Sequence, residues 1–139
     1  MIVIDTNVVS ELMRPRPNSA VLAWDARQPR RDLFTTSITK AEVYHGIALL
    51  PDGRRKSTLA AGAQRLFEGV LARRILSFDA TAAVHYAEIL SLRRRAGRPM
   101  TTLDGQIAIA LTAGAPIATR NVGDFEGCGL TIMDPWTAA

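Results

Sequence analysis

The sequence predicts one α/β domain, built on a central parallel sheet of about five strands with helices covering both faces. Its length of 139 residues fits a single domain spanning residues 1–139. Short apolar runs alternate with amphipathic stretches along the chain, which is typical of strand–helix–strand units. The first run, Ile2 to Ile4, is wholly β-branched, as expected for a strand buried on both faces in the middle of a parallel sheet.

The first half of the chain predicts helices between two strands. Helix-capping residue types follow the first strand at 5–7, and apolar residues at helical spacing come after them. Proline-containing stretches at 14–17, 29–32 and 51–53 mark loops or turns. The elements expected in order are a helix to about residue 13, a short helix from Asn18 or Ser19 to 26, a strand at 33–37 and a helix at 40–50.

The second half predicts three further strands among helices. The elements expected in order are a helix at 54–72, a strand at 75–78, a helix from an Asp79 cap to about 96, a helix from Thr101 or Thr102 to 113, a strand at 117–119, a loop or helical turn at 121–125 and a strand at 130–133. The apolar stripe of the 54–72 helix is Leu59, Ala63, Leu66, Phe67 and Val70. The side of the next helix expected to face the core carries Ala83, Val84, Ala87, Leu90 and Ser91.

The chain is basic, with a formal net charge of +4 carried by fifteen arginines and two lysines. Much of this charge lies in runs, which are Arg30-Arg31, Arg54-Arg55-Lys56, Arg73-Arg74 and Arg93-Arg94-Arg95. The guanidinium group can donate two hydrogen bonds to one phosphate, so the runs favour a polyanionic partner. An ordinary solvated surface is the alternative for each single run.

The sequence also predicts a cytoplasmic address. The single cysteine, Cys128, cannot form an internal disulfide, which fits a reducing compartment. No signal peptide precedes the first strand, and no apolar run is long enough to cross a membrane.

Four carboxylates are expected to meet at the carboxyl edge of the predicted sheet: Asp5, Glu42, Asp104 and Asp124. Each also has a local explanation. Asp5 can cap the first helix, and Glu42 follows Thr39 at the spacing of a capping box, which local grounds favour. Asp104 can stabilise the first turn of a helix, and Asp124 can be an ordinary loop acid.

Taken together, the four acids predict a site for a divalent cation. Clustered carboxylates repel one another unless a cation lies between them, and oxygen ligands select Mg²⁺ or Mn²⁺. His45, His85 and Cys128 are isolated in the sequence, so nothing indicates zinc. Such a site on an arginine-rich chain favours phosphoester chemistry. Repulsion alone also predicts that Asp5→Asn or Asp104→Asn stabilises the metal-free protein.

Two other classes of protein fit less well. A haloacid-dehalogenase-type phosphatase needs a second aspartate where this chain has Asn7, and a receiver domain needs a lysine where it has Arg120. A module that binds nucleic acid without catalysis would not need acids in all four places.

Four motifs in order resemble the PIN domain, in particular the VapC toxins of bacterial toxin–antitoxin pairs and their FitB-type relatives. They are IVIDTN at 2–7, SITKAE at 37–42, TLD at 102–104 and ATRNVGDF at 118–125. The resemblance implies an Mg²⁺- or Mn²⁺-dependent ribonuclease with the four acids around the metal. A PIN-fold subunit that binds nucleic acid or regulates a partner, without robust nuclease activity, is the alternative.

The same resemblance implies roles for the remaining motif residues and for partners. Thr6 and Thr119 would offer hydroxyls to the metal, a water or the substrate, and Asn7 would order the site. Arg120, beside the site, is expected to contact substrate. The expected partners are an RNA substrate, a second copy of the chain and a VapB-like antitoxin that also binds operator DNA. Transfer RNA, a ribosomal loop and messenger RNA all remain open as targets.

Overall fold

A parallel five-stranded sheet in the order β3-β2-β1-β4-β5 organises the protein. The computed structural model describes residues 1–97 and 103–137, without the side chains at 103 and 104. The strands are β1 (Ile2–Ile4), β2 (Leu33–Thr36), β3 (Ile75–Leu76), β4 (Ile117–Ala118) and β5 (Ile132–Met133). The predicted fold class is therefore confirmed.

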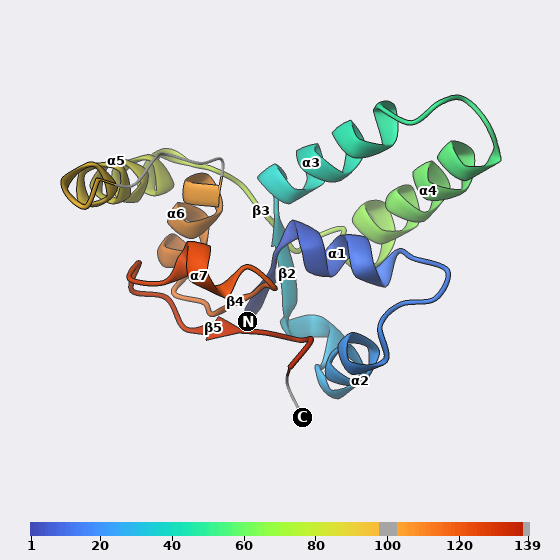
Figure 1. Cartoon of the computed structure of the whole chain (residues 1–139), viewed down its shortest axis with the longest axis horizontal. Coiled ribbons are helices and arrows are strands. Elements are labelled where there is room, and N and C mark those ends of the chain that lie inside the picture. Colours follow the sequence, from blue (N-terminus) through green and yellow to red (C-terminus); the bar gives the residue numbers. More distant parts are fainter. Residues whose placement is uncertain (98–102, 138–139) are drawn as a thin grey trace.

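Helices cover both faces of this sheet (Figure 1). On one face lie α1 (Thr6–Leu12), α2 (Ser19–Arg27), α3 (Ser37–Ala48) and α4 (Arg54–Arg65), the last continued by a π-helical segment, η2 (Leu66–Val70). On the other lie α5 (Ala80–Arg95), α6 (Leu103–Ala113) and α7 (Val122–Phe125). A short 3₁₀ turn, η1 (Arg30–Asp32), precedes β2.

The central strand β1 contributes to two hydrophobic cores. Val3 is fully buried in the core formed with α5 and α6, whereas its neighbour Ile4 is buried in the core formed with α1 to α4. Successive side chains of a strand point to opposite faces, so burial of both confirms that β1 lies in the middle of the sheet.

Strand order reverses at β1, because β2 lies on one side of it and β4 on the other. The loops that leave β1 and β4 therefore diverge at their carboxyl ends, where open α/β sheets bind ligands. Asp5 follows β1 directly and Thr119 follows β4. The fold thus places both residues at this switch point.

Helix α3 begins at Ser37, three residues before the position that the sequence predicts. Thr36, the last residue of β2, caps the helix by accepting a hydrogen bond of 3.0 Å from the backbone N–H of Thr39. Thr39 therefore lies inside the first turn, and Glu42 lies in the second. The expected capping box of Thr39 with Glu42 is wrong, so capping does not explain Glu42.

The predicted 54–72 helix changes geometry near its end. The backbone N–H of Leu71 bonds the carbonyl of Leu66 at 2.8 Å, a spacing of five residues that marks a π-helical turn. The extra residue rotates the following side chains around the axis. Val70, expected in the apolar stripe, is consequently 46% exposed, and Leu71 is buried in its place.

The apolar side expected for α5 is also wrong. Val84 is 60% exposed, while Ala82 and Ile89 are buried against the α6 side of the sheet. Alanines occur on several sides of this helix, so they do not favour burial of one side over another. The larger Tyr86 and Ile89, one turn apart, pack into the core and decide the orientation. The Thr101 or Thr102 cap expected for α6 lies outside the described residues.

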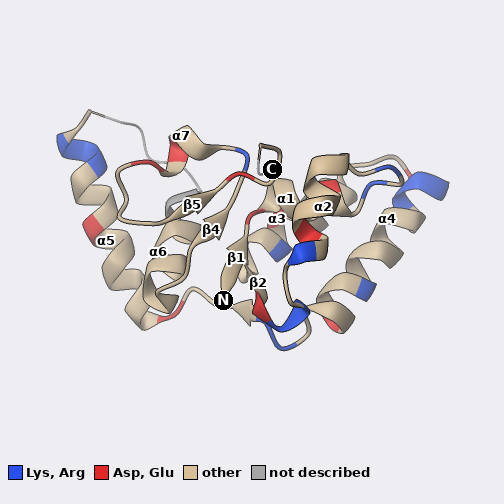
Figure 2. Cartoon of the chain, turned by 90° about the horizontal axis from the view of Figure 1, so that it is seen from below, with Lys and Arg blue, Asp and Glu red and all other residues tan. Residues whose placement is uncertain are grey.

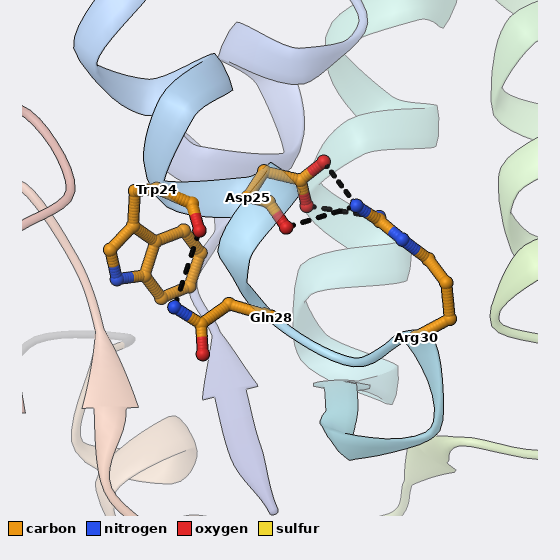
Figure 3. Close-up of polar contacts among 4 residues, drawn as sticks. All are labelled: Trp24, Asp25, Gln28 and Arg30. Atoms are coloured by element: carbon orange, nitrogen blue, oxygen red, sulfur yellow. Dashed lines mark hydrogen bonds and ion pairs between the residues drawn. The ribbon is translucent and has the colours of Figure 1, made fainter.

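The arginine at the start of η1 has an intramolecular partner (Figure 3). Arg30 donates to both carboxylate oxygens of Asp25, at 3.0 and 2.7 Å, and to its backbone carbonyl at 3.0 Å. Hydrogen bonding to Asp25 raises the pKa of Arg30. This arginine therefore joins α2 to η1, which favours a structural role for it over phosphate binding.

None of the helices in the described ranges combines the length and apolar character that a bilayer crossing requires.

Candidate active site

Asp5 is the most deeply buried of the site's acids whose side chains are described. Its side chain is 1% exposed and caps α1 by accepting a 2.7 Å hydrogen bond from the backbone N–H of Thr6. The capping role expected from the sequence therefore exists. Three side chains also donate hydrogen bonds to the Asp5 carboxylate: Gln106 Nε2 at 2.6 Å, Thr119 Oγ1 at 2.8 Å and Asn7 Nδ2 at 3.3 Å. A cap alone needs none of these.

Glu42 joins Asp5 through Thr6. The Thr6 hydroxyl donates a 2.7 Å hydrogen bond to Glu42 Oε2, while the Thr6 backbone binds Asp5. The second oxygen, Glu42 Oε1, is buried and accepts no hydrogen bond within the described part of the chain. Buried polar atoms are usually satisfied, so this oxygen is available to a further ligand.

Asn7 and Thr119 connect the loops after β1 and β4. Asn7 Nδ2 donates to Thr119 Oγ1 at 3.2 Å, and Asn7 Oδ1 accepts from the backbone N–H of Arg120 at 3.2 Å. The Arg120 guanidinium lies over the ring of Trp136, 5.1 Å from its centroid. This cation–π interaction holds Arg120 beside the site.

Asp104 and Asp124 are the two remaining acids of the predicted site. Asp104 lies in the first turn of α6, and its side chain is outside the described residues. Asp124 lies in α7 with an exposed side chain, and its backbone carbonyl accepts a 2.7 Å hydrogen bond from Arg93. Among the side chains described, no three His, Cys, Asp or Glu residues are grouped closely enough to hold a metal ion. The structure therefore brings together Asp5 and Glu42 with Thr6, Asn7 and Thr119, whereas within the described residues no hydrogen bond joins the side chain of Asp124 to them.

Gln106 and Thr39 join this network although sequence reasoning did not place them there. Gln106 is fully buried, and its Oε1 accepts hydrogen bonds from the hydroxyls of Thr39 at 2.8 Å and Thr36 at 3.1 Å. The signal in the sequence was the single amide of Gln106 in a predicted helix, directly before the wholly apolar run 107–111. A polar side chain there needs buried partners.

Gly105 allows α6 to approach α3. A Cβ at this position would lie 2.5 Å from Ile38 Cδ1, which is shorter than van der Waals contact. The missing side chain therefore helps to bring Gln106 within reach of Thr36 and Thr39.

We expect Gly105→Ala to destabilise the wild-type protein more than it destabilises an Ile38→Val background. Valine lacks the Cδ1 atom that an alanine at 105 would meet, so the two changes should couple by about 1 kcal/mol. Urea unfolding of the wild type, both single variants and the double variant measures the coupling. Equal effects of Gly105→Ala in both backgrounds would contradict the packing argument.

Comparison with known proteins identifies the family. The model of the PIN-domain family matches residues 2–126.

The chain belongs to the PIN-domain family.

Individual PIN proteins resemble it over their full lengths. VapC ribonuclease Y4jK of Sinorhizobium fredii is 40% identical over 144 residues, covering 100% of both chains. Toxin FitB of Neisseria gonorrhoeae is 37% identical over 137 residues, covering 98% of this chain and 99% of the relative. The solved structure of FitAB bound to an IR36 DNA fragment superposes with a TM-score of 0.91 at 36% identity, covering 100% of this chain and 98% of that one.

The donor set of this PIN domain fits Mg²⁺ or Mn²⁺. The groups around the switch point are carboxylates and hydroxyls, the hard oxygen ligands that these ions prefer. The buried oxygen of Glu42 that lacks a partner in the described ranges is a ready ligand. Asp5 already accepts four hydrogen bonds, and the 3.3 Å contact from Asn7 is the longest, so a cation would most easily replace that one.

A groove runs between α1, α3 and α4 and reaches Glu42. It encloses about 260 Å³. Its walls carry apolar side chains, among them Val43 and Ile47, and two arginines, Arg14 and Arg55. The groove can therefore accept an apolar segment that also carries acidic side chains.

Proposed function

We propose that this PIN domain is the toxin of a type II toxin–antitoxin pair and acts as an Mg²⁺- or Mn²⁺-dependent ribonuclease. One observation carries the proposal: Asp5 and Glu42 are joined through Thr6 at the switch point of the sheet, with one buried Glu42 oxygen that has no hydrogen-bond partner among the described residues. The names of the relatives, VapC ribonuclease and Toxin FitB, support it. Asp104 and Asp124 complete the proposed ligand set.

The protein's own groups have distinct roles in this proposal. A bound divalent ion supplies a water of lowered pKa and stabilises negative charge on the phosphate. Asp5 and Glu42 bind the ion, and Thr6 orients Glu42 through its hydroxyl. Thr119, from the loop after β4, and Asn7, from the first turn of α1, orient Asp5. Arg120 holds the scissile strand by its phosphates.

The experiment that tests the activity is cleavage of mixed RNA by the purified chain, with Mg²⁺ and with a chelator. We expect cleavage only with the metal ion. Sequencing of the product ends then identifies the RNA. A folded chain that leaves RNA intact in Mg²⁺ and in Mn²⁺ would overturn the proposal and favour the binding or regulatory subunit.

We propose that the bound RNA strand passes Arg120 rather than the basic runs at the end of α5 and the start of α4. Figure 2 shows basic residues at the outer end of α5 and at the start of α4, on opposite sides of the molecule. Arg54 and Arg55, at the start of α4, are exposed, as is Arg120. Arg120, in contrast, lies one residue from Thr119 and is held by Trp136.

We expect Arg120→Ala to weaken RNA binding more than Arg54→Ala. Arg120→Ala removes an ordered charge beside the site, and each residue that binds a phosphate also contributes about one unit to the slope of log K against log salt. Titration of the catalytically silent Asp5→Asn protein with single-stranded RNA at several salt concentrations measures both quantities. Equal affinities and equal slopes for the two arginine variants would remove any special role of Arg120.

The proposed partners are a VapB-like antitoxin, operator DNA bound through that antitoxin, and a second copy of the chain. The FitAB structure contains DNA, which supports the first two. The groove beside Glu42 is where we place the antitoxin segment. Val84 and Leu92, 60% and 56% exposed on α5, offer an apolar face for the homodimer.

A further inference from the structure

Gln106 is a fully buried amide in a helix that otherwise serves the hydrophobic core. Its neighbours Ile107, Ala108, Ile109 and Ala110 are all buried apolar residues. Burying an amide costs free energy unless its donors and acceptor are paired. The contacts that pair Gln106 therefore indicate what the side chain does.

The contacts fix the orientation of the amide. Nε2 donates to Asp5 Oδ1 at 2.6 Å, and Oε1 accepts from the hydroxyls of Thr36 and Thr39. The reverse orientation would place Oε1 against a carboxylate oxygen at 2.6 Å, which is repulsive. The Nε2 end must therefore face Asp5. Because the two threonine hydroxyls bind Oε1 at the other end of the amide, they hold Nε2 in place against Asp5.

Gln106 closes a ring of polar contacts through the site. It binds Asp5 Oδ1, and its Oε1 accepts from Thr39 at 2.8 Å. Thr39 Oγ1 lies 3.1 Å from Thr6 Oγ1, a contact that shares no proton when Thr39 donates to Gln106 and Thr6 donates to Glu42. The Thr6 backbone N–H returns to Asp5 Oδ1 at 2.7 Å. Glu42 is attached to the same ring through the Thr6 hydroxyl. One side chain thus links both carboxylates to α6.

We propose that Gln106 is a positioning residue, which holds the Asp5 carboxylate in the orientation that binds the divalent cation. The proposal rests on the metal-dependent function proposed above. Thr119 and Asn7 contact the other oxygen, Oδ2, so Gln106 and the Thr6 backbone are the groups that hold Oδ1. Without Gln106, the Thr6 N–H is the one donor among the described residues that still holds Oδ1 against rotation of the carboxylate group.

The test compares Gln106→Met with the wild type and with Gln64→Met. Methionine keeps the length of the side chain and removes the amide. Gln64 lies exposed on α4, where its amide binds Glu68, so Gln64→Met is a matched control remote from Asp5. Mn²⁺ binding by each full chain is measured by electron paramagnetic resonance, after circular dichroism has shown that each is folded.

We expect Gln106→Met to raise the Kd for Mn²⁺ about 10- to 100-fold, as loss of residues that orient metal ligands does. Gln64→Met should leave it unchanged. A folded Gln106→Met protein with wild-type Mn²⁺ affinity would overturn the inference, because a purely structural amide predicts that result. If Gln106→Met does not fold, Thr39→Val decides instead: it removes one hydroxyl that orients the amide, and an unchanged Kd for Mn²⁺ would overturn the inference.

A metal-free crystal structure separates this inference from the proposed function. If the wild type binds no Mn²⁺, the proposal of a metal-dependent nuclease is overturned. The positioning role of Gln106 is then still tested by the orientation of the Asp5 side chain in the crystal. We expect the Asp5 carboxylate to leave its wild-type orientation in metal-free Gln106→Met, or in Thr39→Val where that is the folded variant. An Asp5 side chain that stays in place in the variant would overturn the positioning role.

Discussion

Asp5→Asn is expected to abolish metal-dependent RNA cleavage while the chain remains folded. Asparagine keeps the shape of the side chain and removes the charge that would bind the cation. Loss of a residue that merely supports a metal ligand costs about 10- to 100-fold in activity, so loss of the ligand's charge should cost more. Initial cleavage rates in Mg²⁺, with folding checked by circular dichroism, measure the effect.

The matched control for this experiment is Asp52→Asn. Asp52 has a fully exposed side chain in the turn before α4 and pairs with Lys56 at 3.4 Å, remote from the switch point. Expressed alone in cells, the wild type and Asp52→Asn should both inhibit growth, whereas Asp5→Asn should not. Undiminished cleavage by folded Asp5→Asn protein would remove Asp5 from the active site.

The second large effect concerns stability without metal. Repulsion among four acids, considered alone, predicts that Asp5→Asn is stabilising. The hydrogen bonds reverse the expected sign, because all four contacts to Asp5 come from donors: Thr6, Asn7, Gln106 and Thr119. An asparagine amide would turn its own N–H groups toward two of these donors. We therefore expect Asp5→Asn to lower the free energy of unfolding by about 2 kcal/mol, the scale of hydrogen bonds to a charged group.

Unfolding curves of the wild type and Asp5→Asn, each with chelator and with Mg²⁺, test both effects together. Mg²⁺ at a hundredfold excess over its dissociation constant should stabilise the wild type by about 2.7 kcal/mol. The variant should gain much less. A variant that is more stable than the wild type in chelator would show that repulsion outweighs the four hydrogen bonds. A wild type indifferent to Mg²⁺ would count against a metal site.

The fold could be predicted because its signals are local. The apolar run at 2–4 identifies a central strand, and the acid that follows it identifies the sheet edge. The predicted helix boundaries and faces were wrong where the choice of capping residue or a π-helical turn decides them. Thr36 starts α3 early with its hydroxyl, and the π turn before Leu71 moves Val70 to the surface. Neither event changes the apolar period of the sequence.

The site could be predicted only in part. Asp5 and Glu42 lie where strand ends and helix starts must meet, and their motif residues Thr6 and Thr119 contact them as neighbours in space. Gln106 gave no periodic signal, because one amide inside an apolar helix resembles an imperfect core position. Its partner Asp5 lies 101 residues away in the chain, so only the folded topology reveals the pair.

The central position of β1 also determines when the site can exist during synthesis. Of the five strands β1 is synthesised first, whereas its neighbour β4 and the donors Gln106 and Thr119 are made about 100 residues later. Contacts across 101 and 114 residues close late, since long loops must form before they do. A nascent chain that stops before α6 therefore carries Asp5 without its later hydrogen-bond donors.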